Sequence, residues 1–304
     1  MEFIISHEDA GLTVRRFLAL KIPLSSKMLK YLKYRPDGIC VGGERRTVRY
    51  ILREGDILTL ATEDGESPPH LAPVDLPLEI LYEDGELVVP SKRANMPTHP
   101  SHDHRNDTVA NALAFRYAKE GIPFVFRPIN RLDRNTSGLL LVARNKLAAG
   151  RLSQALAAGE IQKTYLAILD GELSPGEGEI DACLHRTEKS IIVREVCSPD
   201  APDAAPSLTR YRVLAAGNGH TLVEAQPVTG RTHQLRVHFA HLGHPITGDD
   251  LYGTPCPDIG RHALHARKLS FPHPTTGEHL SPVAPLPEDF AHLLDLYFPN
   301  VPLP

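Results

Sequence analysis

Residues 63–76 divide the chain into two parts of very different size. The segment reads EDGESPPHLAPVDL, with acidic side chains, a Pro-Pro pair and small residues where a packed element would need an apolar run. Proline has no backbone N–H and restricts the residue before it, so such a segment is a poor helix or strand and is typical of a linker. In a chain of 304 residues, this break predicts two domains, residues 1–62 and 77–304.

The two parts also differ in net charge. Residues 1–60 contain 11 Lys and Arg against 7 Asp and Glu, a net charge of +4, whereas the whole chain carries −4. The remaining residues therefore carry −8. Because binding to phosphates depends on Lys and Arg, the overall charge argues against a nucleic-acid partner, but the small basic part allows one.

The basic part has the pattern of a compact α/β module. The stretches LTVRRFLALKI and SSKMLKYLKY carry apolar residues at roughly helical spacing, and a serine stands where it could cap the second helix. Short β-type runs follow in GICVGGERRTV and ILREGDILTL. The apolar residues that define the helices are Leu12, Phe17, Leu20, Met28, Leu29 and Leu32. The basic residues on the polar sides either contact an anionic partner or simply solvate an exposed helix face.

The larger part combines strand-like runs with helices. The stretch DTVANALAFRYAKEG predicts a helix that Thr108 caps and Gly121 ends. Strand-like runs occur in LEILYEDGELVVPSK, GLLLVAR, TYLAILDGEL, SIIVREV, LTRYRVLAA and HTLVEAQPV. This order predicts an α+β domain. No apolar run approaches the ~18 residues of a membrane span, and the acidic start MEFIISHEDAGL is unlike a secretory signal, so we expect a cytoplasmic protein without membrane association.

One carboxylate, Asp133, lies in a polar turn directly before an apolar run. The stretch NRLDRNTSGLLLVARN predicts a loop at the edge of a buried strand, which can hold a catalytic side chain on a rigid base. For an average aspartate, a surface ion pair or a turn-forming role is the more common explanation. Arg131 and Arg134 would favour the charged form if they approach it closely. An ionised carboxylate can act as a nucleophile or a base.

A second dense segment, PVTGRTHQLRVHFAHLGHPITGDDLYG, spans residues 227–253. A helix is predicted from about Thr232, because apolar residues recur at helical spacing at Leu235, Phe239 and Leu242. Arg236 then lies in the first turns of this helix, on a different face from the apolar residues. A buried arginine needs a carboxylate partner, and we expect that partner to be Asp133.

Sixteen histidines and four cysteines require a test of metal-ligand spacing. The cysteines are scattered with no Cys-x-x-Cys pair, so neither a disulfide framework nor a zinc knuckle is predicted. The stretch THPSHDHR lacks the spacing of binuclear hydrolases, and no glutamate accompanies His238, His241 and His244 in a His-Glu-x-x-His arrangement. We therefore expect no metal, and a metal enzyme is a minor alternative.

Four segments taken together resemble the RluA-type pseudouridine synthases. They are NRLDRNTSGLLL, QKTYLAILDGEL, TGRTHQLRVHFAHLGHPITGDDLYG and LHARKLSFPHPTTGEHLSPVAPLP, within about residues 78–290 and in the family's order. The segment at 8–60 resembles the small αL RNA-binding domain that many members carry, although VRRFL stands where an Arg-Leu-Asp-type run is common. The resemblance implies a central, mostly antiparallel twisted sheet with flanking helices, and an enzyme that isomerises uridine in RNA without a cofactor.

The resemblance assigns roles by position in the motifs. Asp133 drives cleavage of the bond between uracil and ribose, Tyr165 stacks on the target base and is placed for proton transfer, and Arg236 pairs with the carboxylate. Without the motif, Tyr165 would be explained as a strand aromatic that fills the core. In the larger part, Arg131 is expected to fill the space left by the flipped nucleotide, Arg231 and Lys92 to contact RNA, and Leu264 to line the site. For the N-terminal module the resemblance implies RNA binding as a whole, and we expect the contacts to come from the basic helix residues Arg15, Arg16, Lys27 and Lys30.

Two departures from the family's pattern concern the same region. Asn130 stands where the family usually has histidine before its Arg-Leu-Asp, and SKRAN at 91–95 stands where Asn-Lys-Pro-Ala-Gly is more common. Asn95 replaces the glycine, and asparagine tolerates a left-handed backbone better than most residues, so we expect the turn to survive.

The expected substrate is a uridine of ribosomal RNA, with the large subunit favoured. The alternatives are a tRNA pseudouridine synthase, or a non-catalytic RNA-binding or ribosome-assembly factor on the same fold. We expect a monomer with no obligatory protein partner.

Overall fold

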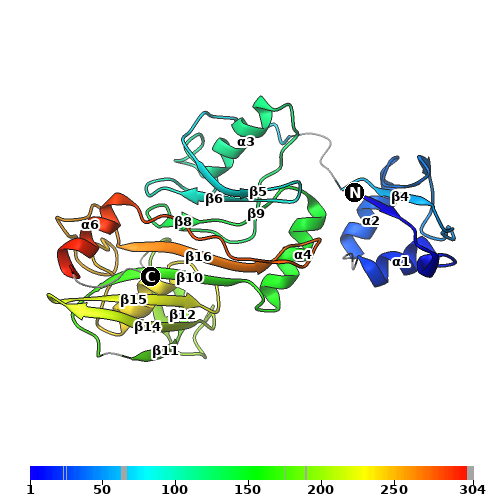
Figure 1. Cartoon of the computed structure of the whole chain (residues 1–304). Helices are drawn as coiled ribbons and strands as arrows, with labels where there is room; N and C mark the ends of the chain where they lie inside the picture. Colours follow the sequence, from blue (N-terminus) through cyan, green and yellow to red (C-terminus); the bar gives the residue numbers. More distant parts are fainter. Residues whose placement is uncertain (23, 25, 63–66, 175, 189, 300–304) are drawn as a thin grey trace.

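The computed structural model describes residues 1–22, 24, 26–62, 67–174, 176–188 and 190–299, and for residues 26 and 27 it describes the backbone alone. This part of the chain contains a four-stranded sheet near the N-terminus and an 11-stranded sheet in the remainder. Figure 1 shows the small sheet and its helices at one end of the molecule. No helix in the described residues is long and apolar enough to cross a membrane.

The first 62 residues form two helices against a small antiparallel sheet of order β1-β4-β2-β3. Helix α1 begins after Thr13, whose side chain accepts a hydrogen bond from the first turn. Its buried face includes Phe17 and Leu18, whereas Leu20, one of the apolar residues at helical spacing, is 57% exposed. The serine cap predicted for α2 falls at residue 25, outside the described residues. The elements are β1 (Glu2–Ile4), η1 (His7–Asp9), α1 (Val14–Lys21), α2 (Ser26–Tyr34), β2 (Ile39–Val41), β3 (Glu44–Arg45) and β4 (Ile57–Leu60).

The large sheet has the order β11-β14-β15-β10-β16-β8-β6-β9-β7, with β5 and β17 paired to β6 and β16. Its pairs are antiparallel except β16 with β8, which confirms the predicted α+β class and mostly antiparallel sheet. The strands are β5 (Glu79–Glu83), β6 (Leu87–Lys92), β7 (Arg127–Pro128), β8 (Ser137–Leu139), β9 (Val142–Ala143), β10 (Gln162–Asp170), β11 (Glu177–Asp181), β14 (Leu208–Gly217), β15 (His220–Pro227), β16 (Leu264–Pro272) and β17 (His279–Leu280).

The large sheet separates two apolar cores, because successive side chains of a strand point to opposite faces. On β6, Val88 belongs to a core shared with helices α3, α5 and α6, while Leu87 and Val89 belong to a core shared with α4. The helix predicted between Thr108 and Gly121 is confirmed, and a capping box at Thr108 starts it. The helices are α3 (Val109–Lys119), α4 (Lys146–Ala157), α5 (Gln234–His241) and α6 (Glu288–Tyr297).

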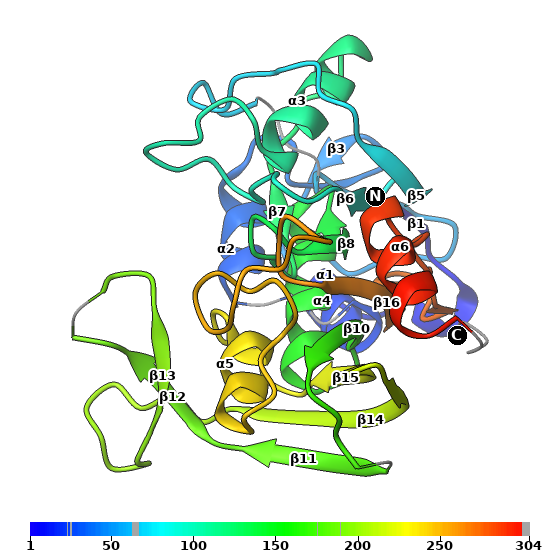
Figure 2. The ribbon, with the colours of Figure 1, turned by 90° about the vertical axis from the view of Figure 1, so that its left-hand side faces the viewer.

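Two predicted strands differ from the structure. The run GLLLVAR is buried from Gly138 to Ala143, but it is split between β8 and β9. In SIIVREV only the second half is a strand, because Ile191 and Ile192 lie in an exposed bend, 80% and 57% exposed. This bend is the tip of a separate hairpin that stands off from the body in Figure 2, formed by β12 (Cys183–Arg186) and β13 (Arg194–Cys197).

The parallel pairing of β16 with β8 is the junction between the two halves of the large sheet. It consists of two residue pairs, His265 with Ser137 and Ala266 with Gly138. Gly138 has φ +112°, and a Cβ atom there would lie 2.2 Å from the carbonyl oxygen of Ala266. Only glycine therefore allows the two strands to approach this closely.

Candidate active site

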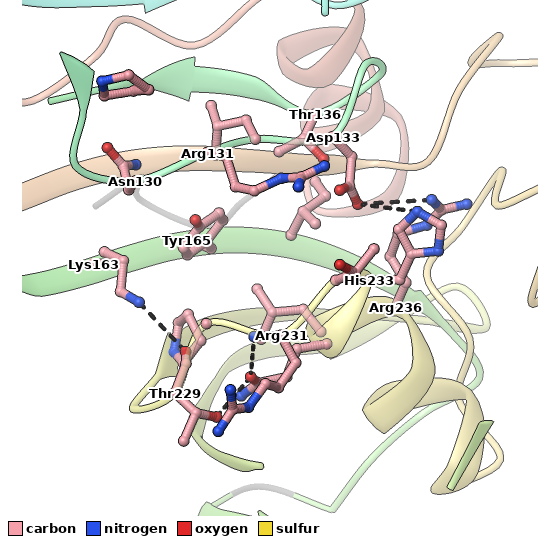
Figure 3. A pocket seen from close by; sticks show the side chains of 18 of the residues that line it. Asn130, Arg131, Asp133, Thr136, Lys163, Tyr165, Thr229, Arg231, His233 and Arg236 are labelled. Carbon is pink, nitrogen blue, oxygen red and sulfur yellow. Dashed lines mark hydrogen bonds and ion pairs between the residues drawn. The ribbon is translucent and has the colours of Figure 1, made fainter. Parts of the chain in front are cut away.

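A cavity of about 340 Å³ opens where the loop before β8, strand β10, the turn between β15 and α5, and the start of β16 meet (Figure 3). These elements are far apart in the sequence, and the sheet brings them together. The cavity wall contains six of the residues selected from the sequence, namely Arg131, Asp133, Tyr165, Arg231, Arg236 and Leu264.

Asp133 lies on a loop that hydrogen bonds fix on both sides. Before it, the Thr98 hydroxyl donates to the carbonyl of Leu132 and accepts from the N–H of the same residue. After it, the N–H of Thr136 donates to the Asp133 carbonyl, and the Thr136 hydroxyl bonds to the buried His262. The Asp133 side chain remains 20% exposed. A rigid loop thus presents an accessible carboxylate.

The positive charge near Asp133 comes from Arg236 and not from its sequence neighbours. Arg236 Nη1 lies 3.7 Å from Asp133 Oδ2. Arg131 and Arg134 are both exposed, and Arg134 Nε donates to Asn95. The described residues show no ion pair between either of these arginines and Asp133, so the close approach on which their predicted effect depended is not observed. Arg131 instead lines the cavity.

Arg236 makes its shortest contacts with Asp249. Its Nε and Nη2 atoms donate to the two carboxylate oxygens of Asp249 at 2.6 Å. Burial alone would raise the pKa of Asp249, but the hydrogen bonds from Arg236 outweigh it and hold this pKa below its usual value. The expected pairing with Asp133 exists at 3.7 Å, but the prediction that Asp133 is the main partner of Arg236 was wrong. A guanidinium has two donor edges, and the buried edge of Arg236 donates to Asp249.

Tyr165 faces the same cavity from β10 (Figure 3). Its side chain is nearly buried, and burial, together with the charge of Asp133, raises the pKa of its hydroxyl above the usual value. The hydroxyl therefore stays protonated at neutral pH. The ring can offer a flat apolar surface, and the hydroxyl can donate or accept a hydrogen bond.

Lys92 was predicted to contact RNA, and the structure contradicts this. The side chain is 1% exposed, and its Nζ atom donates to the carbonyls of Arg93 and Arg134 at 3.0 and 2.9 Å. A lysine buried in this way cannot reach a phosphate. It instead ties the end of β6 to the loop of Asp133.

The same burial predicts a pH dependence of stability. It lowers the pKa of Lys92 to about 7 from the usual 10.5, although the charge of Asp133 opposes this shift. Between these values the unfolded chain binds more protons, so the free energy of unfolding rises with pH, by at most about 1.4 kcal/mol per pH unit. The variant Lys92→Met lacks this rise. Urea unfolding of both proteins across this range checks the prediction, and equal slopes would contradict it.

The two departures from the family's motifs have structural roles. Asn95 has φ 56°, so the left-handed turn expected there is confirmed, and its Oδ1 accepts from Arg134. Asn130 Nδ2 donates to the carbonyl of Leu139, and its Oδ1 accepts from the N–H of Leu141. Asn130 thus fastens the start of the loop that carries Asp133 to the adjoining strands.

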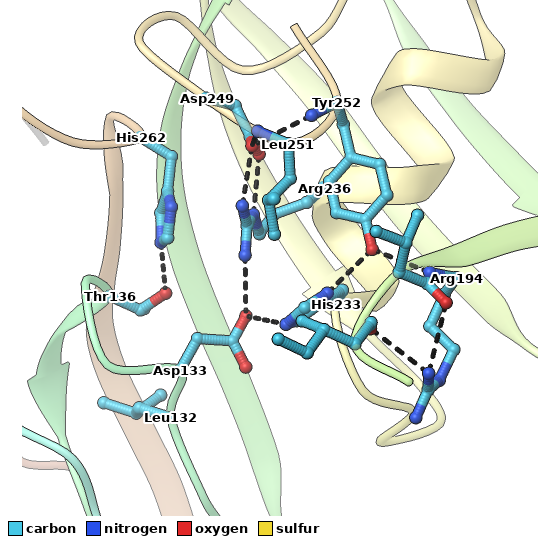
Figure 4. A network of polar contacts seen from close by, with 12 residues as sticks. Leu132, Asp133, Thr136, Arg194, His233, Arg236, Asp249, Leu251, Tyr252 and His262 are labelled. Carbon is cyan, nitrogen blue, oxygen red and sulfur yellow. Dashed lines mark hydrogen bonds and ion pairs between the residues drawn. The ribbon is translucent and has the colours of Figure 1, made fainter. Parts of the chain in front are cut away.

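Sequence reasoning missed four side chains of this site. His233, at the start of α5, and Lys163, on β10, line the cavity. Asp249 and Tyr252 lie behind it and contact Arg236 and His233, respectively (Figure 4). A signal was present in the sequence, since both follow α5 within TGDDLYG, and a buried arginine could have been matched to the acidic pair in that segment.

The remaining predicted contacts are on the small N-terminal sheet domain and at the cavity mouth. Arg15, Arg16 and Lys30 are exposed. The side chain of Lys27 lies outside the described residues. Arg231 is exposed at the cavity, and its Nε donates to the carbonyl of Pro206.

Two of the histidines considered for metal binding make hydrogen bonds to other parts of the sheet domain. His238 contacts the Thr209 hydroxyl and the Ala182 carbonyl, and His244 contacts the carbonyl of Asp170. In the part of the chain that the structure describes, no group of three or more His, Cys, Asp or Glu side chains could hold a metal ion.

A half-buried carboxylate beside a buried arginine, facing a tyrosine across a cavity on a mostly antiparallel sheet, is the arrangement that the resemblance implies for a uridine isomerase. The family described as RNA pseudouridylate synthase matches residues 86–241. The chain belongs to this family, as the resemblance predicted, and is an isomerase that acts on RNA.

Relatives and solved structures agree with this assignment. The uncharacterized RNA pseudouridine synthase YjbO of Bacillus subtilis is 38% identical over 93% of this chain and 98% of its own length. The ribosomal large subunit pseudouridine synthase D of Pseudomonas aeruginosa is 36% identical over 86% of this chain and 84% of its own. The structure of human RNA pseudouridylate synthase domain containing 1 matches with a TM-score of 0.57 and 32% identity, over 69% of this chain and 84% of that one.

Proposed function

We propose that the chain converts a uridine of large-subunit ribosomal RNA to pseudouridine, and that Asp133, Tyr165 and Arg236 carry out the reaction. The observation that supports these roles best is the meeting of a carboxylate, its arginine and a protonated tyrosine in one cavity. The substrate class rests on relatives from Xanthomonas, Haemophilus and Pseudomonas that are named ribosomal large subunit pseudouridine synthase D. Such a substrate would place the enzyme in the cytoplasm.

In this proposal the cavity receives one uridine that has left the stacked helix. Arg131 is exposed at its mouth, where it can occupy the vacated space. Tyr165 and Leu264 flank the base, and Arg236 lies beside Asp133 next to the ribose. The bond from C1′ to N1 breaks, the uracil turns, C1′ bonds to C5, and the proton lost from C5 is balanced by one gained at N1. The product is an isomer, so the reaction consumes no co-substrate.

The test is pseudouridine mapping of total RNA from cells that lack the gene, complemented with the wild-type protein or with Asp133→Ala. We expect one or a few sites of large-subunit ribosomal RNA to lose pseudouridine, and only the wild type to restore them. If pseudouridine is lost at a tRNA site instead, the substrate is that tRNA and not ribosomal RNA. If no site changes and both proteins restore growth equally, the non-catalytic alternative holds.

We also propose that residues 1–62 are an RNA-binding domain. Its exposed basic residues predict a salt-dependent contact, since each neutralised phosphate adds ~0.7 to 0.9 to the slope of log affinity against log salt. Replacing Arg15, Arg16 and Lys30 with glutamine should reduce this slope by about 2 to 3. Filter binding at several salt concentrations measures it.

The matched control replaces three exposed basic residues of the larger part, Lys119, Arg210 and Lys268, with glutamine. The net charge then changes equally, but the slope should stay near that of the wild type. Equal slopes for the two triple variants would contradict an RNA-binding role of the N-terminal residues.

A further inference from the structure

His233 occupies a strained position next to Asp133. It precedes α5 with φ 59° and ψ 15°, a left-handed conformation that residues with a Cβ rarely adopt, and its side chain does not cap the helix. Such strain persists where the surrounding structure holds it, often at functional sites. Figure 4 shows the imidazole between two groups, Tyr252 on one side and Asp133 on the other.

The hydrogen bonds around Tyr252 define where the proton of His233 lies. The N–H of Arg194 donates to the Tyr252 hydroxyl oxygen at 2.9 Å, and His233 Nδ1 lies 2.7 Å from the same oxygen. Among the described residues, Nδ1 is the acceptor available to the phenolic proton. The hydroxyl therefore donates to Nδ1, and a neutral imidazole must carry its proton on Nε2.

The protonated nitrogen faces the catalytic loop. His233 Nε2 lies 3.9 Å from Asp133 Oδ2, the same oxygen that Arg236 Nη1 approaches at 3.7 Å. Figure 4 shows both contacts ending on one oxygen of the carboxylate. Such contacts are commonly long without substrate and shorten in the reactive complex.

We propose that His233 is a positioning residue, which donates Nε2–H to Asp133 Oδ2 together with Arg236 and so leaves Oδ1 free to face the ribose. This inference rests on the proposed role of Asp133. The Tyr252 hydroxyl fixes the tautomer of His233, and the backbone N–H of Arg194, at the start of β13, fixes the orientation of that hydroxyl. Burial lowers the pKa of His233. The nearby charges of Arg236 and Arg194 also lower this pKa, whereas those of Asp133 and Asp249 raise it, and the net shift is downward. The imidazole thus supplies a donor without a second positive charge.

The test compares two replacements that share the backbone strain. Glutamine places an N–H close to the position of Nε2, whereas leucine has a similar size and no donor. With transcribed large-subunit ribosomal RNA, His233→Leu should lower the single-turnover rate about 10- to 100-fold, as for a lost hydrogen bond to a charged group. His233→Gln should recover most of this loss, and RNA affinity should be unchanged in both.

Tyr252→Phe provides the second arm. It lets the imidazole adopt the other tautomer, so the rate should fall about two- to tenfold, as for a lost neutral hydrogen bond. In the double variant His233→Leu/Tyr252→Phe, the loss should equal that of His233→Leu alone, because both residues act through the same N–H. Thermal unfolding confirms that each variant is folded.

The outcomes separate this inference from the proposed function. If the wild type forms pseudouridine and His233→Leu does so at the same rate, or His233→Gln is as slow as His233→Leu, the inference is overturned while the function stands. Additive losses in the double variant would also overturn it. If the wild type forms no pseudouridine in this RNA but does so in another, the rates are measured there. If Asp133→Asn is as active as the wild type, the proposed role of Asp133 is overturned, and the inference about His233 is overturned with it.

Discussion

The variant Asp133→Asn should form pseudouridine roughly 10⁴-fold or more slowly than the wild type, in the range seen when a residue at the reacting centre is removed. The carboxamide has nearly the same shape, but it lacks the negative charge that Arg236 stabilises at 3.7 Å and is a poor nucleophile or base. RNA affinity and stability should change little, because the side chain is partly exposed. Single-turnover assays and filter binding measure the two effects.

Asp250 offers the matched control for this variant. Its Oδ1 lies 3.7 Å from Arg236 Nη2, the same separation as for Asp133, but its side chain is 68% exposed and does not line the cavity. Asp250→Asn should therefore retain nearly full activity. If the two variants lose activity equally, the loss reflects the charge around Arg236 and not chemistry at Asp133.

The variant Arg236→Met should be both inactive and strongly destabilised. Removing the guanidinium leaves the fully buried carboxylate of Asp249 without its cation, which typically costs about 3–5 kcal/mol. In Arg236→Met/Asp249→Asn, most of this stability should return, because the carboxamide oxygen still accepts from the N–H groups of Leu251 and Tyr252. Activity should remain lost, since Asp133 still lacks its cation. Urea unfolding and single-turnover assays separate the two effects.

The double variant is the informative one. If it regains activity along with stability, Arg236 is only a structural partner of Asp249. If it regains neither, the loss in the single variant comes from the missing packing of the arginine side chain and not from an unpaired charge.

The sequence predicted the parts of this molecule that depend on local patterns. The α3 helix follows from Thr108 and Gly121, and the left-handed turn at Asn95 follows from the tolerance of asparagine. The family's motifs also identified Asp133, Tyr165 and Arg236, which line one cavity. The helix and the turn are recognisable because neighbouring residues determine them, whereas the three site residues were identified by the resemblance to the family.

The errors concern which groups meet in space. Lys92 was expected on the surface because lysine usually is, but two backbone carbonyls compensate its burial. The cation nearest Asp133 is Arg236, 103 positions later, and not the adjacent arginines, because the direction of a side chain depends on how its loop is anchored. Asp249 was missed for the same reason, since its pairing with Arg236 needs the turn after α5 to fold back.

The junction between β16 and β8 determines how closely the reactive groups approach one another. Asp133 belongs to the half of the sheet that ends at β8, whereas Tyr165 and Arg236 belong to the half that begins at β16 and β10. Two residue pairs join these halves, with a glycine at the closest approach. Because this junction is so short, a few degrees of added twist between the two strands would move the carboxylate of Asp133 relative to Arg236. Reactivity in this enzyme is therefore adjustable by substitutions at this junction, whose paired residues do not themselves line the cavity.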